Sequence, residues 1–149
     1  MKSLASKEVL AETKERLLRL TPEDRALWGR MSVTQMVRHL LCACEMALGD
    51  RNMEPRKGPL PWLLKSVALR SGLRWPKNVD TTPELIMALE EQTTATFVEL
   101  VDETIARMEA IATGVRWKSS HPMFGPMSAK DWMRWGYLPT DHHLRQFGR

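Results

Sequence analysis

Four histidines are the side chains of this chain best suited to chemistry: His39, His121, His142 and His143. A neutral imidazole is a common ligand for transition metals and can also act as a general acid or base. Neighbouring positions on an ideal helix are rotated by about 100°, so His142 and His143 are not expected to reach one ion together unless the helix is bent. Each histidine can instead be a hydrogen-bonded structural residue.

His39 lies in a segment with strong helix signals. Ser32 and Gln35 have the spacing of a capping box, in which each side chain satisfies a free backbone amide of the other. An apolar stripe then continues to about Gly49, which predicts a long helix. His39 is at the edge of that stripe and is therefore expected to face the interior of a helix bundle or its rim.

His142 and His143 belong to the last predicted helix, which Ser128 and Asp131 are expected to cap. Pro139 lies inside this helix. Proline cannot donate a backbone hydrogen bond and costs about 3 kcal/mol in a helix interior, so we expect a kink or an interruption there.

Three other side chains of this last helix are candidates for ligand binding. Trp132 and Trp135 are three residues apart on one helical face and could form the wall of an apolar pocket, although tryptophans at this spacing are more often plain core or a dimer interface. Arg145 could hold an anionic ligand, and its ordinary alternative is a capping or interface role.

The remaining patterns predict an all-α protein with one domain over residues 1–149. No strand pair is expected. A short helix carrying Trp28 is expected after Pro22, and Gly114 is expected to end the longest helix. The other predicted helices cover about residues 6–20, 60–73 and 83–113, and the predicted loops cover 50–61, 75–82 and 117–127.

Composition and charge limit the partners. The chain has 43% hydrophobic and 27% charged residues, and its net charge of +4 comes from dispersed basic residues. The densest basic stretch, residues 51–74, lacks the signatures of nucleic-acid-binding modules. Nucleic-acid binding, suggested by a pI near 9.3, is therefore only a minor alternative.

Cys42 and Cys44 point about 200° apart on a helix and cannot form a disulfide within it. They are expected to be reduced thiols. The N-terminus has no apolar leader pattern, and no run approaches the ~18 apolar residues needed to cross a bilayer. These features predict a cytoplasmic protein without a membrane partner.

Three strings of the chain resemble a known family. They are residues 28–40, with Trp28-Gly29-Arg30-Met31-Ser32, Gln35-Met36 and His39-Leu40; residues 121–125, with His121-Pro122 and Phe124-Gly125; and residues 142–148, His142-His143-Leu144-Arg145-Gln146-Phe147-Gly148. In this order they resemble the DUF1569 family of the DinB-like superfamily. The resemblance implies a DinB-like bundle of four main helices with additional short helices, usually a homodimer, with a metal pocket at one end.

The resemblance also implies which residues would bind the metal, a divalent ion such as zinc (Zn), nickel (Ni) or iron (Fe). Relatives with a metal are expected to use one histidine of the second main helix and two of the last, at positions i and i+4. His39 matches the first position and His143 the last. The remaining position is Pro139, which cannot be a ligand. A third ligand would have to come from His121, His142 or Asp141.

Two functions follow from these observations. The first is a small-molecule-binding or interaction protein with an incomplete histidine metal site, whose ligand is a small apolar or thiol compound. The alternative is a divalent-metal-dependent enzyme like the thiol-dependent transferases of the superfamily, in which the metal lowers the pKa of a thiol or water. In that enzyme His39 and His143 would hold the metal, and the region of Trp132 and Trp135 would receive the apolar part of the substrate.

Overall fold

Helices make up most of the chain in the computed structural model, which describes residues 1–55, 60–72, 74–77, 94–114 and 116–149. The described helices are α1 (Lys7–Leu18), α2 (Val33–Leu48), α3 (Pro61–Arg70), α5 (Phe97–Thr113) and α6 (Ala129–Gln146). A two-stranded antiparallel sheet, β1 (Ser120–His121) and β2 (Gly125–Pro126), precedes α6. The prediction of an all-α fold is confirmed at this level.

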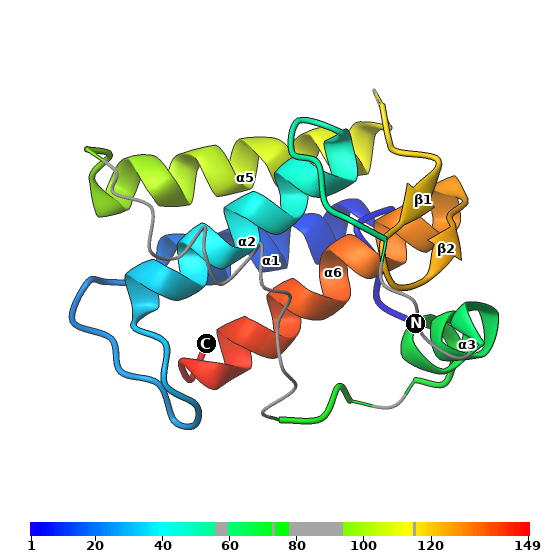
Figure 1. Cartoon of the computed structure of the whole chain (residues 1–149). Helices are drawn as coiled ribbons and strands as arrows, with labels where there is room; N and C mark the ends of the chain where they lie inside the picture. Colours follow the sequence, from blue (N-terminus) through cyan, green and yellow to red (C-terminus); the bar gives the residue numbers. More distant parts are fainter. Residues whose placement is uncertain (56–59, 73, 78–93, 115) are drawn as a thin grey trace.

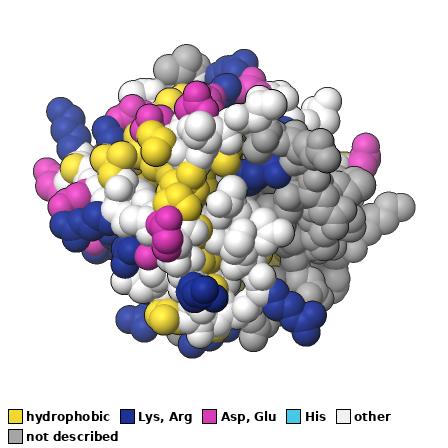
Figure 2. Space-filling model, turned by 90° about the vertical axis from the view of Figure 1, so that its left-hand side faces the viewer, with side chains coloured by type: hydrophobic (Ala, Val, Ile, Leu, Met, Phe, Trp, Pro, Cys, Tyr) yellow, Lys and Arg dark blue, Asp and Glu magenta, His cyan; other side chains and the backbone are white. Residues whose placement is uncertain are grey.

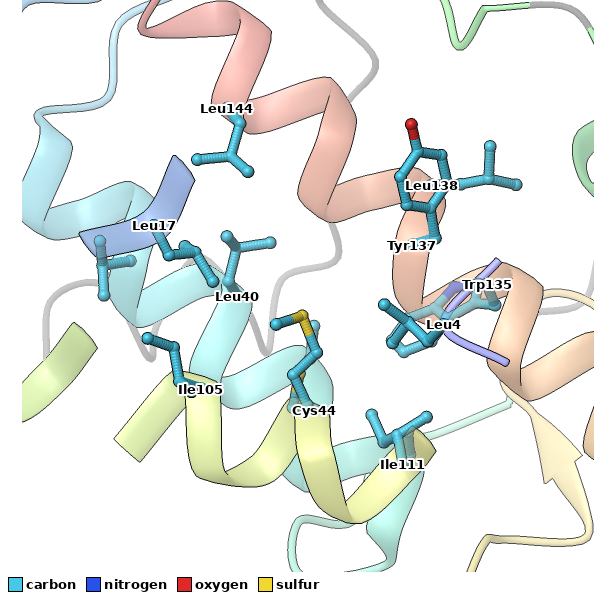
Figure 3. Close-up of a cluster of buried hydrophobic side chains, with 14 of the residues drawn as sticks. Leu4, Leu17, Leu40, Cys44, Ile105, Ile111, Trp135, Tyr137, Leu138 and Leu144 are labelled. Atoms are coloured by element: carbon cyan, nitrogen blue, oxygen red, sulfur yellow. The ribbon is translucent and has the colours of Figure 1, made fainter. Parts of the chain in front are cut away.

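Helices α1, α2, α5 and α6 form the body of the molecule, with α2 packed most extensively along α5 (Figure 1). Helix α3 and the small sheet lie at the end of this body where α6 begins. Figure 3 shows how apolar side chains from α1, α2, α5 and α6 converge between the helices, among them Leu17, Leu40, Ile105 and Leu144. This core fixes α2 and α6, the two helices that carry the candidate histidines, relative to one another.

The predicted capping boxes of α2 and α6 are both present. The hydroxyl of Ser32 accepts a hydrogen bond from the amide of Gln35, and Ser128 does the same for Asp131. Gly114 ends α5 in the left-handed conformation with φ of 71°, as predicted. Local sequence signals therefore define the start of both histidine-bearing helices.

The prediction of one continuous helix over residues 83–113 is confirmed from Phe97 to Thr113 and is wrong at residues 94–96. Residues 94–96 are not helical, and α5 begins at Phe97 behind a capping box of Thr96 and Glu99. Because Glu99 accepts a hydrogen bond from the Thr96 amide, 2.7 Å away, this pair defines a helix start inside the expected continuous helix. The earlier part of the predicted helix lies outside the described residues.

Two further predictions are wrong. The segment after Pro22 forms turns, not a short helix. The carboxylate of Asp24 accepts hydrogen bonds from the Thr21 amide and from the Arg149 guanidinium, and these bonds stabilise a turn against the chain end. The predicted loop over 117–127 contains the two-residue strands β1 and β2, which are too short to give an alternating pattern in the sequence.

Pro139 does not interrupt the last helix, since α6 runs as one helix to Gln146. The proline is buried, and tertiary packing holds the turn in which it lies. Gly136 approaches the segment before α1 so closely that an added Cβ would lie 2.7 Å from the Leu4 side chain. The Thr140 hydroxyl also donates a hydrogen bond to the Gly136 carbonyl at 2.9 Å. Packing around the turn therefore outweighs the hydrogen bond that proline removes.

The surface carries both signs of charge. On the face seen in Figure 2, basic and acidic side chains are interspersed around exposed hydrophobic ones. None of the helices in the described part of the chain is both long enough and apolar enough to span a membrane.

Candidate histidine site

Three of the four histidines lie together between α2 and α6. The ring centroids of His39 and His143 are 4.8 Å apart, and those of His142 and His143 are 5.2 Å apart. His39 retains only 8% of its exposure. The structure thus brings His39 and His143 into ring contact. It also places His142 beside His143, although ideal helix geometry had predicted that these two would not reach one ion together.

Two nitrogens of this cluster have no hydrogen-bond partner among the residues that the structure describes. They are the Nδ1 atoms of His39 and His142, both fully buried. Buried polar atoms in folded proteins are nearly always paired, because leaving one unpaired costs about 1 to 3 kcal/mol. Such atoms therefore point to a missing partner, which is a water, an ion or a ligand.

Gln146 holds His143 in place from one turn further along α6. Its Oε1 lies 2.9 Å from Nδ1 of His143, and its Nε2 donates to the carbonyl of Trp28 at 2.8 Å. The Leu27 amide donates to the backbone carbonyl of Gln146, also at 2.8 Å. The loop that carries Trp28 is therefore tied to the C-terminal end of α6.

Trp28 forms one wall of the cluster. Its ring lies 6.0 Å from that of His142 in an edge-on arrangement, and the ammonium of Lys77 lies 4.4 Å from the Trp28 ring. Sequence reasoning missed this role, because Trp28 was assigned to a helix that does not form. The i, i+3 spacing of His143 and Gln146 was the available signal for the other missed contact.

Burial keeps the cluster uncharged. Desolvation lowers the pKa of His39 to about 4, and that of His143 to about 3, with smaller contributions from the neighbouring histidines. Desolvation and the charge of Arg145 also lower the pKa of His142. At neutral pH the site therefore presents neutral imidazoles, the form that can accept a hydrogen bond or bind a metal.

The residues present do not complete a three-ligand metal site. Pro139 stands where the resemblance predicts a third ligand, and Asp141 is engaged by the Arg16 and Arg145 guanidiniums at 2.8 and 2.9 Å. Among the described residues, no group of three or more His, Cys, Asp or Glu is arranged to hold a metal ion. A stable divalent site normally needs three protein ligands, so the described donors fit a metal poorly.

Arg145, a candidate for anion binding, forms its ion pair within its own helix. Its Nε donates to Asp141, and its side chain is 28% exposed. This ion pair neutralises much of the charge that an anionic ligand would need. Arg145 therefore lies close to the cluster in sequence but already has an anionic partner.

His121 lies with the tryptophans, near the opposite end of α6. Its ring stacks on Phe124 with centroids 4.5 Å apart and lies 5.3 Å from the Trp135 ring. Trp135 precedes His143 by eight residues, or about 12 Å along a helix axis. Nδ1 of His121 accepts a hydrogen bond from the Met123 amide at 3.1 Å. Desolvation lowers the pKa of His121 to about 4. The structure does not bring His121 to the other three histidines.

Trp132 and Trp135 are core residues. Their exposures are 0% and 5%, and the Trp132 indole donates to the Lys118 carbonyl at 2.8 Å. A cavity of about 460 Å³ adjoins His121, but neither tryptophan lines it. Its lining consists of Met53, Pro55, Pro61, Lys118, Ser119, Ser120, His121, Pro122 and Gly125. The packing of the two tryptophans therefore fits core residues better than the wall of a ligand pocket.

Cys44 is not a candidate nucleophile. Both cysteines are buried thiols, and burial raises the pKa of the Cys44 thiol to about 12. The reactive form of cysteine is the thiolate, which Cys44 does not form near neutral pH.

Comparisons with protein-family models, with curated proteins and with solved structures gave no match to this chain. The resemblance to the DinB-like superfamily therefore remains a prediction from the three sequence strings.

Proposed function

We propose that this chain is a DinB-like helical bundle that binds a small molecule at the His39, His142 and His143 cluster without a resident metal. The observation that carries the proposal is the pair of buried Nδ1 atoms of His39 and His142, which have no partner in the described part of the chain. A bound molecule that reaches these nitrogens would remove the cost of burying them unpaired.

The chemistry of the cluster suits a ligand that is mostly apolar. Its imidazoles are kept neutral by burial, and the Trp28 ring forms one side. Small-molecule sites in proteins are usually apolar walls with a few polar groups that fix orientation. A small apolar compound with one polar end, or a thiol, matches this description.

The alternative is a divalent-metal-dependent enzyme like the thiol-dependent transferases. One contact favours it, since metal-binding histidines usually donate their second ring N–H to a carbonyl or carboxylate, and Nδ1 of His143 lies 2.9 Å from Oε1 of Gln146. Pro139 counts against it, because a proline occupies the position of the third ligand. We rank this function second for that reason.

Elemental analysis of untagged protein purified without chelator separates the two. We expect no stoichiometric metal in the native protein, and metal gained in Pro139→His, which restores a histidine one turn before His143. Native mass spectrometry of the same sample should show a bound small molecule that is lost in His39→Ala. About one metal per chain in the native protein, lost in His39→Ala, would instead favour the enzyme.

A homodimer in the cytoplasm remains part of the proposal. Sedimentation equilibrium of the purified chain measures its mass in solution directly. A mass of two chains at micromolar concentration is the expected result, and a mass of one chain would contradict it.

A further inference from the structure

The orientation of the Gln146 amide is fixed by its two partners. The Trp28 carbonyl can only accept, so the amide nitrogen of Gln146 must face it, at 2.8 Å. The amide oxygen then faces Nδ1 of His143, at 2.9 Å. An amide oxygen accepts only, so Nδ1 of His143 must carry the proton. In the neutral ring the lone pair is consequently on Nε2.

His142 has the opposite arrangement. Burial lowers the pKa of His142, and a hydrogen bond with the backbone of Trp75 opposes this shift, as a carbonyl acceptor does. Nδ1 of His142 has no partner within the described ranges, so the nitrogen that donates to this backbone group is Nε2. The neutral ring of His142 therefore has its lone pair on the buried Nδ1. Two neighbouring imidazoles thus each have an acceptor nitrogen, and two acceptors cannot bond to one another.

We infer that Gln146 is a positioning residue that fixes His143 as the Nδ1–H tautomer, so that the cluster offers lone pairs and takes a ligand that donates N–H or O–H hydrogen bonds. The ligand class rests on the proposed function. The tautomer does not, because the hydrogen bonds of Gln146 exist without any ligand.

The backbone near Trp28 is shaped for this contact. Gly29 has φ of +82°, and an added Cβ there would lie 2.6 Å from Nε2 of Gln146. Glycine therefore lets the loop approach the amide closely enough for the Trp28 carbonyl to accept its hydrogen bond. Both the loop and the tautomer depend on the same side chain.

The tautomer is tested by ¹⁵N NMR of the imidazole nitrogens in the full chain at neutral pH. We expect His143 as Nδ1–H, and His142 as Nε2–H. His121 is an internal control, because its Nδ1 accepts from the Met123 amide and must leave the proton on Nε2. His143 observed as Nε2–H in the native protein overturns the inference.

Two variants separate positioning from a merely structural role. Gln146→Glu keeps an acceptor for Nδ1–H of His143 and should keep the tautomer, although it loses the donor to Trp28. Gln146→Met removes both bonds and should shift His143 towards Nε2–H while His121 stays unchanged. If Gln146→Met retains the Nδ1–H tautomer in a folded protein, Gln146 does not set it. If that variant does not fold, the native protein and Gln146→Glu still decide.

The ligand class is tested with phenol and anisole, which differ in one O–H group. We expect phenol to bind the native protein about tenfold more tightly than anisole, the effect of one hydrogen bond to an otherwise unpaired buried acceptor. This ratio should fall towards one in Gln146→Met. Equal affinities for the native protein, or no binding of either compound, overturn the donor class and leave the tautomer result standing. If the proposed function is wrong, native mass spectrometry would instead show native protein without any bound small molecule.

Discussion

Buried histidines lie against other rings near both ends of helix α6, yet the two regions differ in one respect. At the N-terminal end, His121 lies among Phe124, Trp132 and Trp135, and its Nδ1 accepts the Met123 amide. At the C-terminal end, Nδ1 of His39 is also buried and has no partner among the described residues. Burial lowers the pKa of both histidines to about 4, so burial alone does not distinguish them.

Hydrogen-bond pairing does distinguish them. A buried histidine whose ring nitrogen is paired within the chain, like His121, contributes to the structure by itself. Burying a histidine with an unpaired nitrogen lowers the stability of the fold, and a ligand that pairs with this nitrogen removes the cost. The comparison predicts that changes at the first end mainly lower stability, whereas changes at the second mainly affect binding.

The largest effect is expected at the packed end. Trp132 is fully buried and its indole donates to the Lys118 carbonyl, so Trp132→Ala should lower the free energy of unfolding by about 3 to 5 kcal/mol. Urea denaturation measures this change. Trp62, which is 63% exposed, is the matched control, and Trp62→Ala should cost less than about 0.5 kcal/mol. Similar costs for the two variants would mean that Trp132 is not a core residue.

Acid should destabilise the protein through its buried histidines. The pKa of His121 is about 4 when folded and has an ordinary value of 6.5, so the unfolded chain binds more protons between these values. Above pH 6.5 His121 is neutral in both states and the free energy of unfolding does not depend on its titration. As pH falls from 6.5 towards 4, its titration lowers the free energy of unfolding by up to about 3 kcal/mol. His121→Asn keeps an acceptor for the Met123 amide but does not titrate. The stability of this variant, measured by urea denaturation from pH 7 to 4, should fall less steeply than that of the native protein, and an unchanged slope would refute the lowered pKa.

Several boundaries of the helices around these two ends were predicted from the sequence. The capping boxes of Ser32 and Ser128 are local patterns, and each marks a helix start correctly. Gly114 marks a helix end in the same way. Signals of this kind need only neighbours within about four residues, so they can be found without knowing the fold.

Features that depend on contacts between distant segments were predicted poorly. Pro139 was expected to kink or interrupt α6, and an interruption is wrong, because the helix continues through this turn, where Gly136 packs against Leu4. Trp28 was expected on a helix but lies beside His142, more than a hundred residues later. His39 and His143 were paired only through the family resemblance, because nothing in the spacing of a single sequence reports which helices pack together.

The loop that closes the second end can be tested with a pair of glycines. Gly29 and Gly72 both have left-handed φ values, +82° and +73°, but an added Cβ meets Gln146 at position 29 and nothing within 4 Å at position 72. Gly72→Ala should cost about 1 kcal/mol from backbone conformation alone. Gly29→Ala should cost about 1 to 2 kcal/mol more and should disturb the ¹⁵N signals of His143. Equal losses of stability for the two variants in thermal or urea denaturation would show that the Gln146 side chain moves aside at little cost and does not anchor the loop.

The smallest expected change in stability, and the one that separates the two ends most directly, comes from replacing each histidine by leucine. His39→Leu removes a buried nitrogen without a partner, so stability should stay the same or rise by up to about 1 kcal/mol, while binding of the small molecule is lost. His121→Leu leaves the Met123 amide without its acceptor and should cost about 1 to 3 kcal/mol. Both are measured by urea denaturation at pH 7 on protein dialysed free of small molecules. A loss of stability in His39→Leu as large as that in His121→Leu would mean that Nδ1 of His39 is paired within the protein in solution, and the difference between the two ends would disappear.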